Sequence, residues 1–305
     1  MQAEVSSLRR LHADYYLQRF TSPRLVFEPG QFIMVKPSGS LDPFLPRAYS
    51  ILRVQPPGRR TGGGKTVVEI LYKVIGKGTT ALSQLKRGDR VDFLGPLGNG
   101  YRVPQSLTTA LLVAGGIGVP PVVALAERLA RSRFTVHSSR SAKSGRRSSV
   151  VGRLKIVAFV GGKTRHDVLC VADLRKAGAT VHVVTEDGSL GHRGLVTDLL
   201  ESFLRSSDNG ERSSVFACGP HPMLHAVARI AERVEIPCQV SLEAEMGCGF
   251  GACMGCVIPV QGSGIRDQGS RKPPTMNDEL STMSQVSYKL CCKDGPVFDA
   301  QEIAW

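Results

Sequence analysis

The chain has 305 residues, of which 42% are hydrophobic and 21% charged, and a formal net charge of +13. This composition is typical of a soluble globular protein, and the length predicts two domains or three small ones. No apolar run approaches the roughly 20 residues that a membrane-spanning helix needs. The first residues also lack the apolar core of a secretory signal, so we expect a cytoplasmic location.

The first segment, residues 1–104, is predicted to be an antiparallel β-barrel. Short runs rich in Val, Ile, Leu and aromatic residues are separated by Gly and Pro, as β-strands are. These runs are FIMV, AYSILRV, TVVEILYKVI and RVDFLG. In the third run Val68, Ile70 and Tyr72 alternate as in a half-buried strand. Several short strands with turn signals between them favour a small closed barrel.

The second segment, residues 105–236, alternates between strand and helix patterns. TALLVAGGIG is an apolar run ending in glycines, and VPPVVALAERLA after it has helical spacing. Three more strand-like runs follow, KIVAFVGG, TVHVVTEDG and SVFACGP, with helical stretches around 167–176, 194–205 and 221–233. This alternation predicts a parallel sheet and an α/β domain.

Much of the positive charge lies in one stretch of the second segment. Residues 131–155 contain eight Lys or Arg, many Ser and no Asp or Glu. This composition is typical of a flexible, solvated insertion. Nucleic-acid binding is the alternative, but no recognised nucleic-acid fold or aromatic platform accompanies the charge.

The third segment, residues 237–305, is rich in cysteine and contains a polar insertion at about 261–285. Clustered cysteines in a cytosolic chain indicate a metal site rather than disulfides. By contrast, Cys170, Cys218 and Cys238 lie in or beside apolar runs, where buried inert thiols are expected.

Three of the clustered cysteines have a diagnostic spacing. Cys248, Cys253 and Cys256 form C-x4-C-x2-C, the pattern of plant-type [2Fe–2S] sites, which take a fourth cysteine further along. Cys291 and Cys292 are the candidates for that ligand, and the spacing alone does not choose between them. A structural zinc site is the alternative, but such sites usually pair two C-x2-C units.

Three other motifs are candidate nucleotide sites. Residues 114–121 (AGGIGVPP) sit between a strand and a helix, where dinucleotide phosphates bind, although Pro121 replaces the third glycine of the usual fingerprint. Pro is tolerated in a helix's first turn. In residues 47–50 (RAYS), a guanidinium can hold a pyrophosphate and a tyrosine ring can lie against a flavin. Residues 76–80 (GKGTT) suit a phosphate, or equally a plain loop.

The order of the motifs RAYS, GKGTT, GPLGNGY, AGGIGVPP and CGPHPM, followed by the cysteine loop, resembles the ferredoxin reductase superfamily. More narrowly, SLEAEMGCGFGACMGC, CKDGPVF, TEDGS and GLVTD resemble the electron transfer subunits of class B dihydroorotate dehydrogenase. The resemblance covers nearly the whole chain apart from the two insertions. It implies an FAD-binding barrel, an NAD-binding α/β domain and a small [2Fe–2S] domain.

The resemblance also implies site residues, and no catalytic side chain among them. Its FAD residues are Arg47, Ala48, Tyr49, Ser50, Leu71, Tyr72, Lys73, Gly78 and Thr79. Its nicotinamide nucleotide residues are Gly115, Gly116, Gly118, Pro120, Cys218, Gly219 and Pro220. Its cluster ligands are Cys248, Cys253, Cys256 and Cys292. The resemblance alone favours NAD over NADP. Lys163 and Arg165 follow the domain's second strand, where they could meet the 2′-phosphate of NADP, so NADP stays an alternative.

The function implied is electron transfer between NAD(H), FAD and a [2Fe–2S] cluster. The implied partner is an FMN-containing catalytic subunit that oxidises dihydroorotate in pyrimidine biosynthesis. One alternative keeps the chemistry in another complex: a hydrogenase, a sulfur reductase or an NADH-ferredoxin:NADP type enzyme. Others are a self-sufficient NADH oxidase or ferredoxin-type reductase, and an iron–sulfur protein that binds nucleic acid.

Three features depart from the family pattern. The family usually has Pro where this chain has Ala48, which loosens the backbone but removes no contact group. The basic stretch is longer than expected, and the gap of 35 residues between Cys256 and Cys292 is also long. Because closure entropy grows only logarithmically with loop length, the site should tolerate that gap.

Overall fold

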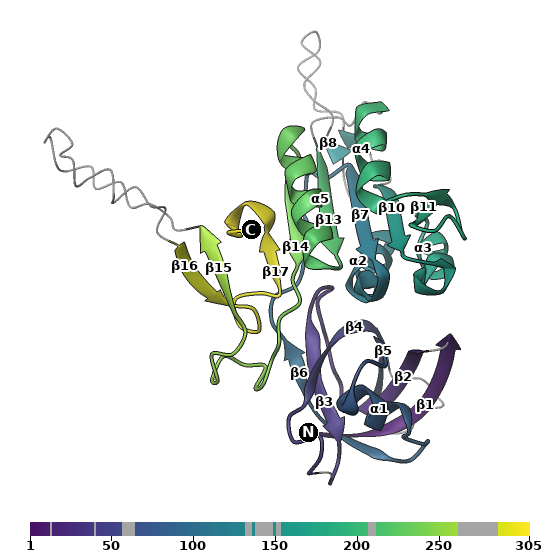
Figure 1. Cartoon of the computed structure of the whole chain (residues 1–305), viewed down its shortest axis with the longest axis vertical. Coiled ribbons are helices and arrows are strands. Elements are labelled where there is room, and N and C mark those ends of the chain that lie inside the picture. The colour runs from purple at the N-terminus through teal and green to yellow at the C-terminus, as the bar shows by residue number, and fades with distance from the viewer. Residues whose placement is uncertain are drawn as a thin grey trace, which may run out of the picture.

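The computed structural model describes residues 1–12, 14–39, 41–56, 65–131, 136–137, 149–150, 154–206, 212–261 and 286–305. Figure 1 shows a barrel, an α/β domain above it and a C-terminal segment beside both. Most of the basic stretch and nearly all of the polar insertion lie outside the described residues. Within the described ranges, no helix has the length and apolarity to cross a membrane.

The predicted N-terminal barrel is confirmed as a closed sheet. Its order is β1-β2-β5-β4-β3-β6, and every neighbouring pair is antiparallel. The helix α1 (Lys77–Ser83) lies between β5 and β6 in the chain, where the sequence predicted only a turn. The strands are β1 (Gln2–His12), β2 (Tyr15–Ser22), β3 (Phe32–Pro37), β4 (Arg47–Gln55), β5 (Thr66–Lys73) and β6 (Arg90–Leu97).

The prediction that β5 is half-buried was wrong. Val68, Ile70 and Tyr72 point into the barrel core as predicted, but the outward face of the strand is also buried. Leu71 packs with residues of the α/β domain, and Glu69 is fully buried. The α/β domain therefore covers this side of the barrel, which a periodicity argument within one strand does not reveal.

The predicted parallel sheet forms the centre of the molecule, in the order β12-β11-β10-β7-β13-β14-β17. All neighbouring strands are parallel except β14 and β17. The strands are β7 (Thr109–Gly115), β10 (Lys155–Gly162), β11 (Thr180–Thr185), β12 (His192–Arg193), β13 (Ser213–Cys218), β14 (Cys238–Ser241) and β17 (Val297–Asp299). Two further short strands, β8 (Val136–His137) and β9 (Ser149–Val150), pair within the basic stretch.

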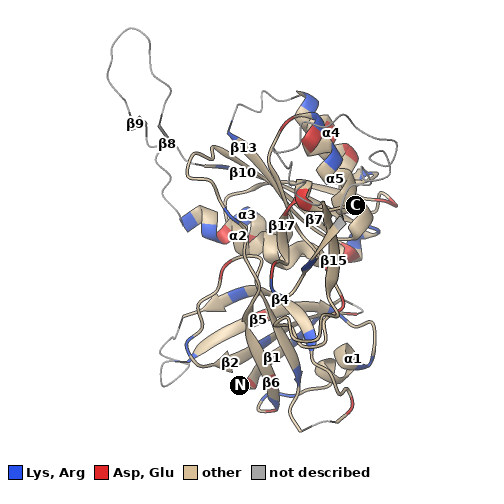
Figure 2. Cartoon of the chain, turned by 90° about the vertical axis from the view of Figure 1, so that its left-hand side faces the viewer, with Lys and Arg blue, Asp and Glu red and all other residues tan. Residues whose placement is uncertain are grey.

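Helices cover both faces of this sheet, as Figure 1 shows. They are α2 (Val119–Arg131), α3 (Val171–Lys176), α4 (Val196–Ser206) and α5 (His221–Arg233), with short 3-10 turns η1 (Gly116–Gly118), η2 (Arg165–Asp167) and η3 (Ala300–Glu302). Alternation along β7 divides the core, because Leu111 and Val113 pack with α4 and α5, whereas Leu112 and Ala114 pack with α2 and α3. Acidic and basic residues are both present along α4 and around the barrel (Figure 2).

The cysteine-rich segment is built onto the edge of the central sheet. β14 and β17 join that sheet, and β15 (Val257–Gln261) pairs with β16 (Val286–Leu290) as a separate hairpin. The domain boundaries expected after residues 104 and 236 stay predictions.

Candidate functional site

The barrel brings two predicted phosphate-binding motifs together. Arg47 begins β4, and its side chain lies against the first turn of α1, since a Cβ added at Gly78 would be 3.1 Å from Arg47 Cγ. Only glycine lets the guanidinium stem approach this turn so closely. Thr79 Oγ1 accepts hydrogen bonds from the backbone N–H groups of Ile75 (3.0 Å) and Gly76 (3.2 Å), which fixes the turn. An exposed guanidinium beside a helix start can receive a phosphate anion.

Two buried tyrosines in the barrel lack hydrogen-bond partners. The Tyr49 and Tyr72 rings meet edge to face, with 5.6 Å between centroids. Both hydroxyl groups are buried, and neither finds a partner among the described residues. Burial raises the pKa of both phenols, so they remain neutral donors. Because an unsatisfied buried hydroxyl is costly, these two positions fit a polar ligand such as the flavin.

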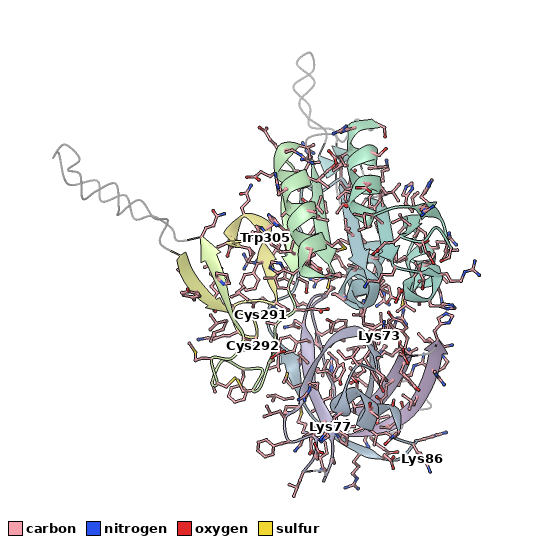
Figure 3. All side chains as sticks on the ribbon, viewed as in Figure 1. Lys73, Lys77, Lys86, Cys291, Cys292 and Trp305 are labelled. Carbon is pink, nitrogen blue, oxygen red and sulfur yellow. The ribbon has the colours of Figure 1, made fainter. Side chains whose placement is uncertain are left out.

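The other residues predicted on β5 face the α/β domain. Leu71 belongs to the apolar cluster that includes α2, and Lys73 lies at the boundary between the two domains in Figure 3. Lys73 Nζ is 3.6 Å from Asp167 Oδ1 and 5.0 Å from the centroid of the Tyr15 ring. The Tyr15 hydroxyl donates to the same carboxylate oxygen at 2.7 Å.

The predicted nicotinamide nucleotide residues meet at the carboxyl edge of the central sheet. Ala114 at the end of β7 pairs with Cys218 at the end of β13. A Cβ added at Gly118 would be 2.5 Å from Cys218 O and 2.7 Å from Gly219 Cα, so the two loops touch through their backbones. In the strand order of the sheet, β10 lies on one side of β7 and β13 on the other. The chain therefore reverses direction across the sheet between β7 and β13, which makes this the switch point. Ligands of open α/β sheets bind at such a point.

The start of the SLEAE run lies beside Cys218, a placement that the motif alone did not reveal. Ser241 pairs with Cys218 across β13 and β14, and the Glu243 carboxylate adds to burial in raising the pKa of the Cys218 thiol. Burial raises the pKa of Glu243 itself. Arg165, which was considered for a 2′-phosphate, donates from Nη2 to the Ser189 carbonyl at 2.7 Å and is exposed.

The clustered cysteines are joined as two pairs. The backbone N–H of Cys253 donates to Cys248 Sγ at 3.4 Å, and that of Cys292 donates to Cys256 Sγ at 3.3 Å. Cys291 is fully buried and its thiol donates to the Leu242 carbonyl, while its backbone N–H donates to Cys256 O at 2.9 Å. No three His, Cys, Asp or Glu side chains in the described ranges gather around a single metal position. The structure therefore places each of the four predicted ligands beside one other, Cys248 beside Cys253 and Cys256 beside Cys292.

The two pairs differ in environment. Burial alone would raise the pKa of Cys248, but N–H groups of its own loop, from Cys253, Phe250 and Ala252, lower it to about 6. Burial and the neighbouring Cys256 thiol raise the pKa of Cys292 to about 12. Loop N–H groups that stabilise a thiolate are the donors that an iron–sulfur cluster also requires.

The cysteine loop packs directly on the barrel strand next to the flavin motif. Met34 on β3 pairs with Ala48 on β4, and a Cβ added at Gly249 would collide with Met34 Cγ. The backbone of Asn99, at the end of the barrel segment, donates to Gly295 O at 2.6 Å. Figure 3 shows Cys291 and Cys292 beside the barrel. The cysteine loop therefore packs on the strand that neighbours the flavin motif.

Comparison with known proteins agrees with this arrangement. Residues 243–270 match the iron–sulfur cluster binding domain of dihydroorotate dehydrogenase B, and residues 112–229 match the oxidoreductase NAD-binding domain. A dihydroorotate dehydrogenase B (NAD(+)) electron transfer subunit from Bacillus caldolyticus is 38% identical over 301 residues, covering 97% of this chain and 95% of that protein. The chain belongs to the dihydroorotate dehydrogenase B electron transfer subunit family.

A second member of this family, from Desulforamulus reducens, is 30% identical over 305 residues, or 99% of this chain and 97% of that protein. Among solved structures, an NADH-dependent reduced ferredoxin–NADP oxidoreductase aligns with a TM-score of 0.72 and 23% identity, covering 99% of this chain and 90% of that chain. A ferredoxin reductase of carbazole 1,9a-dioxygenase aligns with a TM-score of 0.59 and 21% identity, covering 78% and 66%. These structures establish the shared fold, and the family resemblance predicted from the motifs is confirmed.

Proposed function

We propose that this chain is the electron transfer subunit of a dihydroorotate dehydrogenase, working between NAD(H) and an FMN-containing catalytic subunit in pyrimidine biosynthesis. The contact between the cysteine loop and β3 carries the proposal most directly, because it sets the cluster motif beside the flavin motif. When bound, FAD exchanges a hydride with the nicotinamide nucleotide and single electrons with a [2Fe–2S] cluster. The electron path needs these sites to be close, and the packing of the cysteine loop on β3, next to β4, supports this for the flavin and the cluster.

The FAD site assigned here lies on β4, β5 and α1. Arg47 binds the pyrophosphate together with the backbone at Gly78 and Thr79. Four further residues of β4 and β5 line the site: Ala48, Ser50, Leu71 and Lys73. Tyr49 and Tyr72 donate from their buried hydroxyl groups, which otherwise lack partners in the described residues.

The nicotinamide nucleotide site assigned here lies at the switch point of the sheet. Loop 115–120 receives the phosphates, because its N–H groups lie at the start of α2, where the helix dipole favours an anion. Loop 218–220 forms the opposite wall. No side chain in this mechanism takes or gives a proton, so the protein's part is to bind, orient and shield.

The cluster is assigned to Cys248 with Cys253 and to Cys256 with Cys292. Cys256 and Cys292 are buried, whereas Cys253 is exposed and flanked by the exposed side chains of Phe250 and Met254. The exposed edge at Cys253, Phe250 and Met254 is therefore where electrons would pass between a cluster held here and the catalytic subunit. Because none of the eight cysteines, all of which are among the described residues, forms a disulfide, we propose a reducing, cytoplasmic location.

The first experiment is a visible spectrum of the anaerobically purified protein before and after NADH is added. Flavin bands with a broad cluster absorption that NADH bleaches are expected. Adding the FMN-containing catalytic subunit should then make NAD⁺ reduction depend on dihydroorotate. A colourless protein that contains zinc would refute the redox function. NADH bleaching without coupling to that subunit would instead favour a reductase of another complex.

A further inference from the structure

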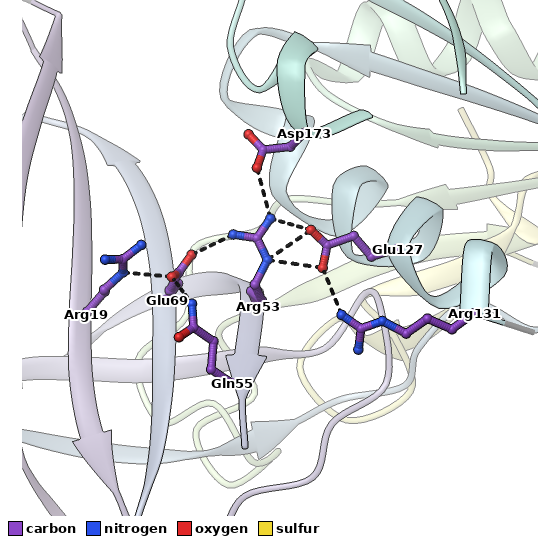
Figure 4. A network of polar contacts seen from close by, with 7 residues as sticks. All are labelled: Arg19, Arg53, Gln55, Glu69, Glu127, Arg131 and Asp173. Carbon is purple, nitrogen blue, oxygen red and sulfur yellow. Dashed lines mark hydrogen bonds and ion pairs between the residues drawn. The ribbon is translucent and has the colours of Figure 1, made fainter. Parts of the chain in front are cut away.

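Arg53 binds three carboxylates, and two of them, Glu127 and Asp173, link the barrel to the α/β domain (Figure 4). It lies on β4, the strand that begins with the flavin motif. Its Nη1 donates to Glu69 on β5 at 3.0 Å, and its Nη2 donates to Asp173 on α3 at 3.0 Å. The same guanidinium donates to Glu127 on α2 from both Nη2 and Nε. The Nε atom lies 2.9 and 3.1 Å from the two carboxylate oxygens.

Most of this contact is shielded from water, the exception being the Asp173 side chain, which is 39% exposed. The Arg53 side chain is 21% exposed and that of Glu127 is 19% exposed, while Glu69 is fully buried. The hydrogen bond to Glu127 raises the pKa of Arg53, so the guanidinium stays charged. Ion pairs in such sites are screened weakly by salt, and a planar guanidinium fork fixes direction as well as distance.

The network connects the two nucleotide motifs through rigid elements. At one end, β4 carries Arg47–Ser50, which we assign to FAD. At the other end, Glu127 lies on α2, and this helix starts directly after the Gly115–Gly118 loop, which we assign to the nicotinamide nucleotide. A rotation of α2 against β4 would therefore move one nucleotide site relative to the other.

Beside the network the two domains do not fill the space between them. A cleft of about 420 Å³ is lined by Arg53 and Glu69 from the barrel side and by Asp173 from the α/β domain, with apolar residues of both. Apolar residues that line the cleft, Leu17 and Leu52 from the barrel and Leu169 from the α/β domain, pack in one buried cluster. The ion pairs add contacts of fixed direction beside it.

We propose that Arg53 is a positioning residue for hydride transfer, holding the α/β domain at the angle that aligns its nucleotide site with the flavin site. The proposal rests on the function proposed above. Hydride transfer moves one hydrogen nucleus with two electrons from NADH to FAD and leaves NAD⁺ and FADH⁻. Arg53 touches neither site and acts only through the placement of β4 and α2.

The test compares the holoprotein with Arg53→Met, Arg53→Lys and Arg19→Met. Arg19 is the matched control, because it also pairs with Glu69, at 2.7 Å, but contacts no α/β carboxylate. Anaerobic stopped-flow reduction by NADH gives the limiting rate and the apparent NADH affinity separately. Hydrogen exchange of β4 and α2 reports the interface independently of turnover.

We expect Arg53→Met to lower the limiting rate at least about tenfold, because small misplacements of reacting groups are costly. Flavin and iron content should be unchanged, and exchange in α2 should be faster. The limiting rate of Arg53→Lys should lie between those of the wild type and Arg53→Met, since lysine keeps the charge but loses the planar guanidinium fork. Arg19→Met should keep the wild-type rate.

A wild-type rate in Arg53→Met would overturn the proposal, and so would an equal loss in Arg19→Met, which would trace the effect to barrel stability. If Arg53→Met does not retain flavin, Glu127→Gln decides, because it weakens the same contact from the α/β side and must slow reduction. A wild-type flavin that NADH fails to reduce would refute the proposed function itself, a result that the variants cannot mimic.

Discussion

At Gly249, one added methyl group should cause loss of the cluster while the rest of the protein keeps its structure and its FAD. Its φ of +83° is left-handed, which costs a non-glycine residue about 1–2 kcal/mol. A Cβ there would also collide with Met34 Cγ and lie 3.1 Å from Leu97 Cδ1. Overpacking of this kind costs about 1–3 kcal/mol. Gly249→Ala should therefore destabilise the cysteine loop by about 2–5 kcal/mol in all.

The control lies in the same loop. Gly251 has a φ of +90°, but a Cβ there would meet only flexible side chains, the nearest atom being Lys293 Cδ at 3.1 Å. Gly251→Ala should thus incur the backbone cost alone, about 1–2 kcal/mol. Urea unfolding measures the free energies, and iron and sulfide per chain report whether the loop still holds the cluster.

We expect Gly249→Ala to lose iron and sulfide while it keeps FAD, because Arg47, Tyr49 and Tyr72 are untouched. Met34→Ala in the same background should recover part of the loss by making room for the methyl group. If Gly249→Ala and Gly251→Ala behave alike, close packing of the loop on β3 is not what holds it, and the argument from that contact fails.

Further predictions concern single atoms. Cys292→Ser should abolish the cluster absorption, whereas Cys291→Ser should keep it, and the reverse result would exchange the two as ligand. Tyr72→Phe should stabilise the flavin-free protein by about 1 kcal/mol by removing an unsatisfied hydroxyl, yet weaken FAD binding as measured by flavin titration; tighter binding would contradict the assignment. Burial would raise the pKa of Asp167, but hydrogen bonds, first among them the one from Tyr15, lower it below the ordinary value of 3.8. The ionised carboxylate therefore stabilises the fold fully above pH 3.8. This stabilisation is lost as the pH falls through the lower pKa of the folded state. Tyr15→Phe should cost about 1.5–3 kcal/mol at neutral pH in chemical unfolding, and the difference should shrink in acid; a difference independent of pH would exclude the charged pair.

The sequence predicted the elements with dense, local signals. β3 to β6 were found because they are rich in β-branched and aromatic residues. β1 and β2 were not: β1 buries only Ala3 and Val5, with the exposed Glu4 between them and the exposed Arg9 and Arg10 beyond. The helical stretch around 167–176 begins later than expected, at Val171, because Cys170 adopts a left-handed φ of 57°.

The candidate site divides in the same way. The cysteine spacing is local and identified a cluster motif, but the choice between Cys291 and Cys292 needed a resemblance, and the structure adds that the Cys291 thiol points to a carbonyl. The network around Arg53 joins four separate elements. No pattern in any one of them marks it, so only the folded chain brings it into view.

The hairpin of β15 and β16 has a consequence for how this protein can vary in length. β15 begins directly after Cys256, and Val257 pairs with Leu290, directly before Cys291. The far end of the hairpin, where Gln261 pairs with Val286, is where the chain leaves for residues 262–285. The ladder thus fixes the spacing of the cysteines whatever the length of chain beyond it. This end of the hairpin is a natural insertion point, at which a reporter or affinity domain could be grafted without altering the metal ligands.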